Sequence, residues 1–152
     1  MKNPLPQFHH LKPAECRGLL RRHHVGRIAF TFKDRVDIEP ISYVFNGQWL
    51  YARSAIGTKL RVLRRHPWVA FEVDEVDGAF DWRSVVVHGT VYFLSDGPGT
   101  RAAYTRAMKI LRTLDPRALT ADDPVPERSI VFRIYVDDIA GRAATTRRAT
   151  GR

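Results

Sequence analysis

The feature that most constrains the fold is a series of strand-like segments separated only by short turns. Residues 26–32 and 35–45 alternate apolar and polar side chains, and residues 48–54 follow directly after Asn46-Gly47. An Asn-Gly pair between alternating segments is typical of a two-residue hairpin turn. Strands joined by turns this short pair antiparallel, because a parallel pair needs a long crossover. The front half of the chain therefore predicts an antiparallel sheet.

The remaining chain predicts further strands and three helices. Strand-like patterns recur in residues 68–74, 82–95 and 128–141, and helical spacing of apolar residues recurs from Pro13 to before Gly26, in residues 58–65 and in residues 99–114. We expect a bulge or bend at Pro40, where the apolar residues change face, and another at Gly89. Six antiparallel strands bent in this way close into a small barrel, which removes exposed edges. The predicted fold is α+β, mainly β, with flanking helices.

Length and charge set the expected organisation of the chain. A chain of 152 residues is close to the commonest size of one domain, which we place at residues 1–142. Residues 143–152, "AATTRRATGR", are basic and rich in small residues, so we expect a disordered tail. The net charge of +9 favours anionic partners, although the tail carries part of it.

The sequence also limits the compartment in which we expect the protein and the kinds of metal site that it can contain. Cys16 is the single cysteine, which excludes an internal disulfide and a multi-cysteine zinc site. The N-terminus lacks the apolar core of a signal peptide, and no segment approaches the run of about 18 apolar residues that a membrane helix needs. We therefore expect a soluble cytoplasmic protein without a bound metal or a membrane partner.

The stretch from Arg53 to Lys59 predicts an anion site. A strand ends at Arg53-Ser54, and a helix begins near Thr58 after Gly57. Backbone N–H groups at a helix start lack partners and carry partial positive charge, which suits a phosphate group. Ser54 and Thr58 can donate hydroxyl hydrogen bonds, and Arg53 and Lys59 add full charges. The alternative is a plain solvated helix, which fits Arg61, Arg64 and Arg65.

A second pattern, "DWRSVVVHG", places Trp82 and Ser84 on one face of a strand. An aromatic plane beside a hydroxyl suits a flat heteroaromatic ligand. The alternative is that Trp82 packs on the core and that Ser84 has no role in binding.

Taken together, residues 10–141 resemble a known family. The pattern combines a proline-bent strand, an Asn-Gly hairpin, an aromatic strand that ends in a small polar turn, a lysine at a helix start, a His-Pro stop and a Trp-x-Ser-Val strand start. In combination these elements resemble the pyridoxamine 5′-phosphate oxidase-like FMN-binding split-barrel superfamily, in particular its short nitroimidazole-resistance-type branch.

The resemblance implies a six-stranded split barrel that forms a homodimer and binds FMN at the dimer interface. It implies that the FMN phosphate is bound by Arg53, Ser54, Thr58 and Lys59. It places Pro40, Ile41, Ser42 and Tyr43 along the edge of the isoalloxazine ring, with Tyr51 and Ala52 flanking the ring. It implies that Trp82, Arg83 and Ser84 come from the partner subunit or a neighbouring strand, and that Arg142 approaches the flavin.

The expected activity is that of an FMN-dependent oxidoreductase acting on a small flat substrate, such as a nitroaromatic compound. No residue stands out as a general base or nucleophile. The chain end does not reproduce the basic C-terminal motif of true pyridoxamine phosphate oxidases, so vitamin B6 oxidation is not expected. The alternative is a non-catalytic carrier of flavin, deazaflavin F420 or haem on the same fold. Arg61, Arg64 and Arg65 could meet the acidic tail of F420, and His88 is the one tempting haem ligand. Nucleic acid is not an expected partner, because the cations collect on a helix and a tail.

Overall fold

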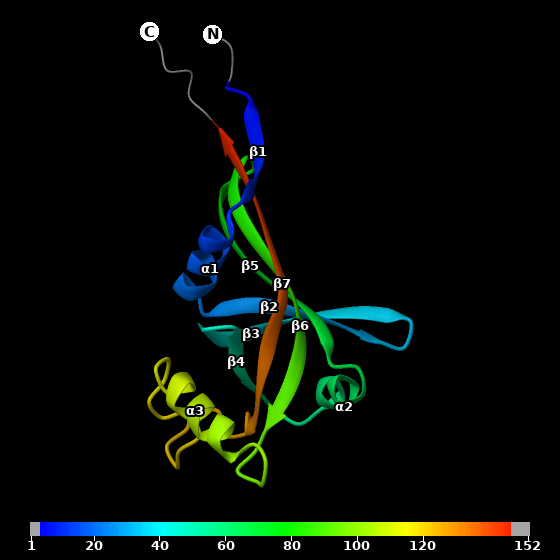
Figure 1. Ribbon diagram of the computed structural model, residues 1–152, viewed down its shortest axis with the longest axis vertical. Helices are drawn as coiled ribbons and strands as arrows, with labels where there is room; N and C mark the ends of the chain where they lie inside the picture. The colour runs from blue at the N-terminus through cyan, green and yellow to red at the C-terminus, as the bar shows by residue number, and fades with distance from the viewer. Residues whose placement is uncertain (1–3, 147–152) are drawn as a thin grey trace.

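The computed structural model describes residues 4–146, which form seven strands and three helices (Figure 1). The strands are β1 (Pro6–Leu11), β2 (Val25–Phe32), β3 (Arg35–Asn46), β4 (Trp49–Ser54), β5 (Trp68–Gly78), β6 (Asp81–Leu94) and β7 (Ile130–Thr146). The helices are α1 (Pro13–Arg22), α2 (Thr58–Arg65) and α3 (Arg101–Leu111). Every strand pairing is antiparallel, which confirms the prediction from the hairpins.

Six of the strands close into a ring. The sheet runs in the order β1-β7-β4-β3-β2-β5-β6, and an additional pairing joins β6 back to β7. Only β1 lies outside this ring, because it pairs with β7 alone. The predicted six-stranded antiparallel barrel is therefore confirmed, with one strand added. Beyond the ring, β1 and the far ends of β5, β6 and β7 extend as an arm toward the two termini (Figure 1).

The arm corrects two expectations. We expected disorder from Ala143 onward, but Ala143–Thr146 form the end of β7, and Ala143 and Ala144 are buried. We also expected six strands, but a seventh, residues 6–11, pairs with residues 141–146 of β7. Each segment lacks an apolar pattern of its own, so the pairing of their backbones decides the structure. Residues 147–152 of the predicted tail lie outside the described residues.

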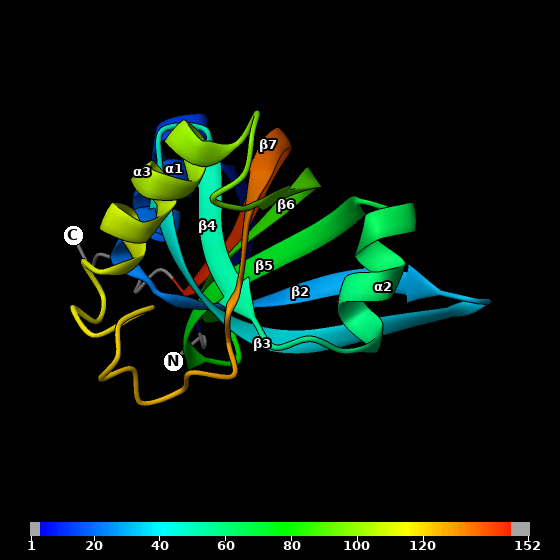
Figure 2. The ribbon, with the colours of Figure 1, turned by 90° about the horizontal axis from the view of Figure 1, so that it is seen from below.

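The helices cover the barrel at different places (Figure 2). Leu19 and Leu20 of α1 are fully buried, and the Tyr43 hydroxyl donates a hydrogen bond of 2.7 Å to the Leu20 carbonyl. Leu63 of α2 joins the same main core, whereas Leu111 of α3 belongs to a second apolar cluster beside β4 and β7. Between residues 4 and 146, none of the helices is long and apolar enough to cross a membrane.

The two predicted irregularities have different outcomes. The β6–β7 ladder shifts register between His88 and Gly89, which confirms the irregularity expected there. The β2–β3 ladder passes Pro40 without any shift, so a bulge at that residue was the wrong expectation. The apolar residues change face because Val36 and Ile38 point away from the core and are 72% and 66% exposed.

This exposed side of the barrel is called the outer sheet face. By strand register it consists of Val25, Arg27, Ala29 and Thr31 of β2, Val36, Ile38, Pro40 and Ser42 of β3, Trp68, Ala70, Glu72 and Asp74 of β5, and Trp82, Ser84, Val86 and His88 of β6. Several of its apolar side chains are more than half exposed, including Val25 and Trp68. Exposed apolar side chains gathered on one face favour an interaction site there, and the same face also carries the ion pairs of Arg27 with Glu72 and Asp74.

Candidate functional site

A cavity of about 350 Å³ opens where β3, β4 and α2 converge. Its lining residues are Val25, Glu39, Pro40, Ile41, Ser42, Arg53, Ser54, Ala55, Lys59 and Arg128. The structure thus brings two predicted groups together, the segment of β3 that follows Glu39 and the cationic strand-to-helix turn. Val25, Glu39 and Arg128 had not been predicted to lie there. The cavity meets the outer sheet face through Val25, Pro40 and Ser42.

The start of α2 provides unpaired backbone donors beside this cavity. Among the residues that the structure describes, no side chain caps the helix, and its first turn contains no acidic residue. The first N–H groups of a helix have no partners within it and form its positive end. A Cβ atom placed on Gly57 would meet nothing within 4 Å, so a ligand can approach the backbone there. Thr58 begins the helix but is exposed and does not line the cavity.

Lys59 is the cation that α2 directs into the cavity. Its Nζ atom lies 2.8 Å from Oε2 of Glu39, which comes from the facing strand β3. The Lys59 side chain is 15% exposed, whereas that of Glu39 is 46% exposed. Glu39 is therefore free to move into solvent when an anion binds, and Lys59 stays in place.

Arg53 has a partner within the chain. Its guanidinium forms two hydrogen bonds to the carboxylate of Asp123, whose side chain is only 2% exposed. Asp123 also accepts hydrogen bonds from the backbone N–H groups of Leu119 and Val125, at 2.8 and 3.0 Å. Arg53 and these N–H groups hold the pKa of Asp123 well below its usual value, so the carboxylate stays ionised. The charge of Arg53 is thereby neutralised.

Arg128 adds an exposed cation that no sequence motif indicated. It precedes β7 and lines both the main cavity and an adjoining cavity of about 190 Å³. The adjoining cavity is otherwise lined by Ser42, Arg53, Leu111, Leu114, Asp115 and Ala118. In Figure 2 the segment between α3 and β7 runs along the underside of this corner of the barrel.

The predicted flanking residues of the ring are mostly buried. Tyr43 and Tyr51 are at most 1% exposed, and Ile41 and Ala52 are also buried. Burial raises the pKa of Tyr43 well above its usual value, so its hydroxyl remains a neutral donor to Leu20. Of these four residues Ile41 lines the cavity, whereas Tyr43, Tyr51 and Ala52 are not among its lining residues.

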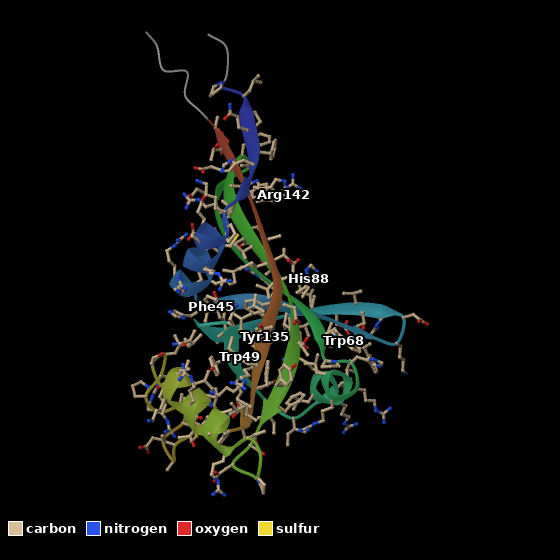
Figure 3. All side chains as sticks on the ribbon, in the orientation of Figure 1. Phe45, Trp49, Trp68, His88, Tyr135 and Arg142 are labelled. Carbon is tan, nitrogen blue, oxygen red and sulfur yellow. The ribbon has the colours of Figure 1, made fainter. Side chains whose placement is uncertain are left out.

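The remaining predicted residues lie elsewhere in the chain. Trp82, Arg83 and Ser84 stand on β6, and strands β2 and β5 separate them from β3. Ser84 pairs in register with Arg142, which Figure 3 shows on the arm, nearer to the termini than His88. The Ser84 hydroxyl donates a hydrogen bond of 2.8 Å to Glu72. One chain alone does not bring this group to the cavity.

A larger, apolar cavity of about 460 Å³ lies on the outer sheet face. It is lined mainly by residues of β2, β5 and β6, including Trp68 and His88, which Figure 3 labels. His88 is 66% exposed on its side chain, and its Nδ1 atom lies 3.9 Å from the Asp138 carboxylate. Because this cavity contains no lysine or arginine, it does not suit a phosphate group.

The fold and the cavity define a class of protein, an antiparallel split barrel with a cationic site at a strand-to-helix corner. The chain belongs to the pyridoxamine 5′-phosphate oxidase family, whose model matches residues 12–143. This result confirms the resemblance that the sequence motifs indicated.

Individual relatives agree with this assignment. An uncharacterized protein of Rhizobium meliloti is 30% identical over 140 residues, which cover 86% of this chain and 91% of the relative. The crystal structure of a FAD-binding protein from Mesorhizobium loti is 27% identical and superimposes with a TM-score of 0.74, covering 91% of this chain and 99% of that one. A structure described as a 5-nitroimidazole antibiotic resistance protein from Bacteroides thetaiotaomicron shares the fold, with a TM-score of 0.71, 15% identity and coverage of 94% and 90%.

Proposed function

We propose that the protein is a homodimeric, flavin-dependent oxidoreductase that acts on a small flat substrate, such as a nitroaromatic compound. The observation that carries the proposal is the cavity in which Lys59 and the uncapped start of α2 face the same space. The flavin, when bound, supplies the redox chemistry, and the protein supplies its position and charge environment. FMN is the form expected from the sequence, and the FAD-binding relative makes FAD the alternative form.

The cavity fits the phosphate end of such a cofactor. Lys59 supplies a full charge, and the first turn of α2 supplies backbone N–H donors. A hydrogen bond to a charged group contributes about 1.5–3 kcal/mol, so a few such bonds anchor a phosphate group. The open backbone at Gly57 allows that group to approach closely.

The ring of the flavin needs more cover than one chain provides. The cavity opens onto the outer sheet face at Val25, Pro40 and Ser42, and this face exposes Val36 and Ile38. A second copy packed on the face would bury these side chains and enclose the ring, as isologous dimers do. In this arrangement Trp82, Ser84 and Arg142 reach the ring from the second copy.

The first test is the cofactor itself. Freshly purified protein should be yellow, and the mass of the extracted cofactor should be that of FMN or FAD. Apoprotein should bind the same flavin in a fluorescence titration. Colourless protein that binds neither flavin in the titration would remove the proposal.

A non-catalytic carrier is the second candidate. Among the described residues that line the cavity there is no histidine, and the one carboxylate, Glu39, is paired with Lys59. The described lining of the cavity therefore offers no imidazole and no unpaired carboxylic acid to a substrate, and the cavity could serve to hold flavin or F420. The apolar cavity beside His88 is the place for haem in this alternative. A bound, reduced cofactor that no electron acceptor reoxidises enzymatically would favour the carrier, whereas steady turnover would favour the enzyme.

A further inference from the structure

We infer that Arg128 is the second cation that contacts the phosphate of the bound flavin, and that Arg53 is a positioning residue that fixes the backbone of Arg128. The inference rests on the proposed function, since it concerns the same phosphate site. It replaces the role that the sequence suggested for Arg53.

Arg53 already forms an ion pair with Asp123. Its guanidinium binds both carboxylate oxygens of Asp123 and is only 13% exposed. The Asp123 carboxylate is buried and accepts two backbone hydrogen bonds from its own loop. A phosphate that drew the Arg53 guanidinium away from Asp123 would leave this carboxylate buried without its countercharge, which is costly. Lys59 differs, because its partner Glu39 is nearly half exposed.

Arg53 also holds the backbone of Arg128 in place. Nη1 of Arg53 donates a hydrogen bond of 3.3 Å to the Arg128 carbonyl. The Arg128 N–H donates a hydrogen bond of 3.0 Å to the Val125 carbonyl. The Arg53–Asp123 pair therefore ties β4 to the loop before β7 and fixes the point from which the Arg128 side chain extends.

The Arg128 side chain lies at the main cavity. Arg128 lines the main cavity together with Lys59, and within residues 4–146 its guanidinium takes part in no ion pair. It also lines the adjoining cavity, so it stands where the two spaces meet. A guanidinium suits phosphate because its donors match the phosphate oxygens in pairs. The phosphate monoester of FMN and the diphosphate of FAD both present this chemistry.

The test compares flavins with and without phosphate. Apoprotein is titrated with riboflavin, FMN and FAD while flavin fluorescence is followed. The variants are Arg128→Gln and the double variant Arg53→Gln/Asp123→Asn, which keeps the net charge and removes the paired contacts of the Arg53 guanidinium. Arg106→Gln, at an exposed position on α3, controls for the loss of one positive charge. Thermal unfolding of each variant reports whether the barrel remains folded.

We expect Arg128→Gln to weaken FMN or FAD binding at least tenfold while riboflavin binding and thermal unfolding stay as in the parent. The double variant should also weaken FMN or FAD binding, but less than Arg128→Gln does, because Arg128 loses its backbone anchor and keeps its charge; Arg106→Gln should match the parent. The form of flavin that loses most affinity identifies whether the site takes a phosphate or a diphosphate. If Arg128→Gln binds FMN and FAD as tightly as the parent does, the inference is overturned while the proposed function stands. If adding Arg128→Gln to the double variant weakens FMN or FAD binding further, Arg53 contacts the phosphate itself and the inference is overturned; no further loss means that Arg53 acts through Arg128. A parent that binds neither FMN nor FAD would overturn the proposed function and the inference together.

Discussion

Lys59 and Glu39 form a 2.8 Å ion pair across the candidate phosphate cavity, so the cation proposed to bind the ligand already holds a carboxylate. The pair joins the first turn of α2 to the facing strand β3. An incoming phosphate must displace Glu39, and the two anions compete for one ammonium group. Because of this competition, substitutions at Lys59 and at Glu39 should both change the affinity for flavin, in opposite directions.

Removing the lysine charge should weaken flavin binding. Lys59→Gln is expected to reduce FMN affinity about tenfold or more, because a hydrogen bond between charged groups contributes roughly 1.5–3 kcal/mol. Riboflavin, which has no phosphate, should bind the variant as it binds the parent. Arg61→Gln, on an exposed position of α2, is the matched control. Unchanged FMN affinity in Lys59→Gln would place the phosphate outside this cavity.

Removing the competing carboxylate should have the opposite effect. Glu39→Gln is expected to raise FMN affinity about twofold to fivefold, since partly exposed ion pairs contribute only about 0.2–1 kcal/mol. The same titration measures it, at low and at high salt, and the gain should shrink as salt screens the charges. A loss of affinity in Glu39→Gln would mean that the carboxylate contacts the ligand directly.

The buried pair of Arg53 and Asp123 should govern stability in acid. Arg53 keeps the pKa of Asp123 below the value of about 3.9 that an unfolded chain gives it. As the pH falls, the unfolded state therefore takes up this proton first. The stabilisation is complete at neutral pH and is lost progressively as the pH falls through about 4 toward the folded-state value.

Asp123→Asn tests this linkage. The variant should unfold at a lower temperature than the parent at pH 7, because Arg53 loses its countercharge. Its stability should fall less steeply than that of the parent between pH 5 and pH 3, measured by urea denaturation. Parallel pH profiles for the two proteins would show that the pair is not the titrating element.

Close packing at Gly89 should make this position intolerant of a side chain. A Cβ atom there would lie 2.5 Å from the Tyr135 carbonyl oxygen, at the register shift between β6 and β7. Gly89→Ala is therefore expected to destabilise the protein by roughly 1–3 kcal/mol in urea denaturation, as overpacking does. Gly78→Ala is the control, since nothing lies within 4 Å of its added Cβ. Equal denaturation midpoints for the two variants would contradict the tight packing.

The outer sheet face should control the oligomeric state. Ile38→Glu places a charge on an exposed apolar side chain of β3, next to Val36. We expect this variant to be monomeric in light scattering after size exclusion and to bind FMN weakly, and we expect the parent to be a dimer in the same measurement. Thr105→Glu, exposed on α3, should remain dimeric. A monomeric parent that binds FMN tightly would separate flavin binding from dimer formation.

The sequence predicted the parts of this protein that depend on local patterns. The hairpin between β3 and β4, the short helix from Thr58 to Arg65 and the closed ring of six strands followed from turn chemistry, apolar spacing and the cost of open edges. The turn itself lies one residue later than predicted, at Gly47-Gln48, because Asn46 pairs with Trp49. The cationic turn containing Lys59 was placed at a cavity for the same reason, because a strand end and a helix start meet there.

The missing parts depend on contacts between distant segments. Residues 6–11 form a strand only because the end of β7 lies beside them, and no alternation marks either segment. Asp123 lies 70 positions from Arg53, so no spacing pattern connects them. Arg128 reaches the cavity because that pair ties down its loop. Trp82 and Ser84 share a face, as predicted, but one chain keeps them apart from β3.

Determining a crystal structure of the protein with bound FMN would test most directly the claim that Lys59 and the start of α2 bind the flavin phosphate. The account predicts a phosphate group within hydrogen-bond distance, about 2.7–3.2 Å, of Lys59 and of backbone N–H groups in the first turn of α2. It also predicts that Arg53 remains bound to Asp123 in that structure. A phosphate located away from α2, with Lys59 still paired to Glu39, would contradict the account.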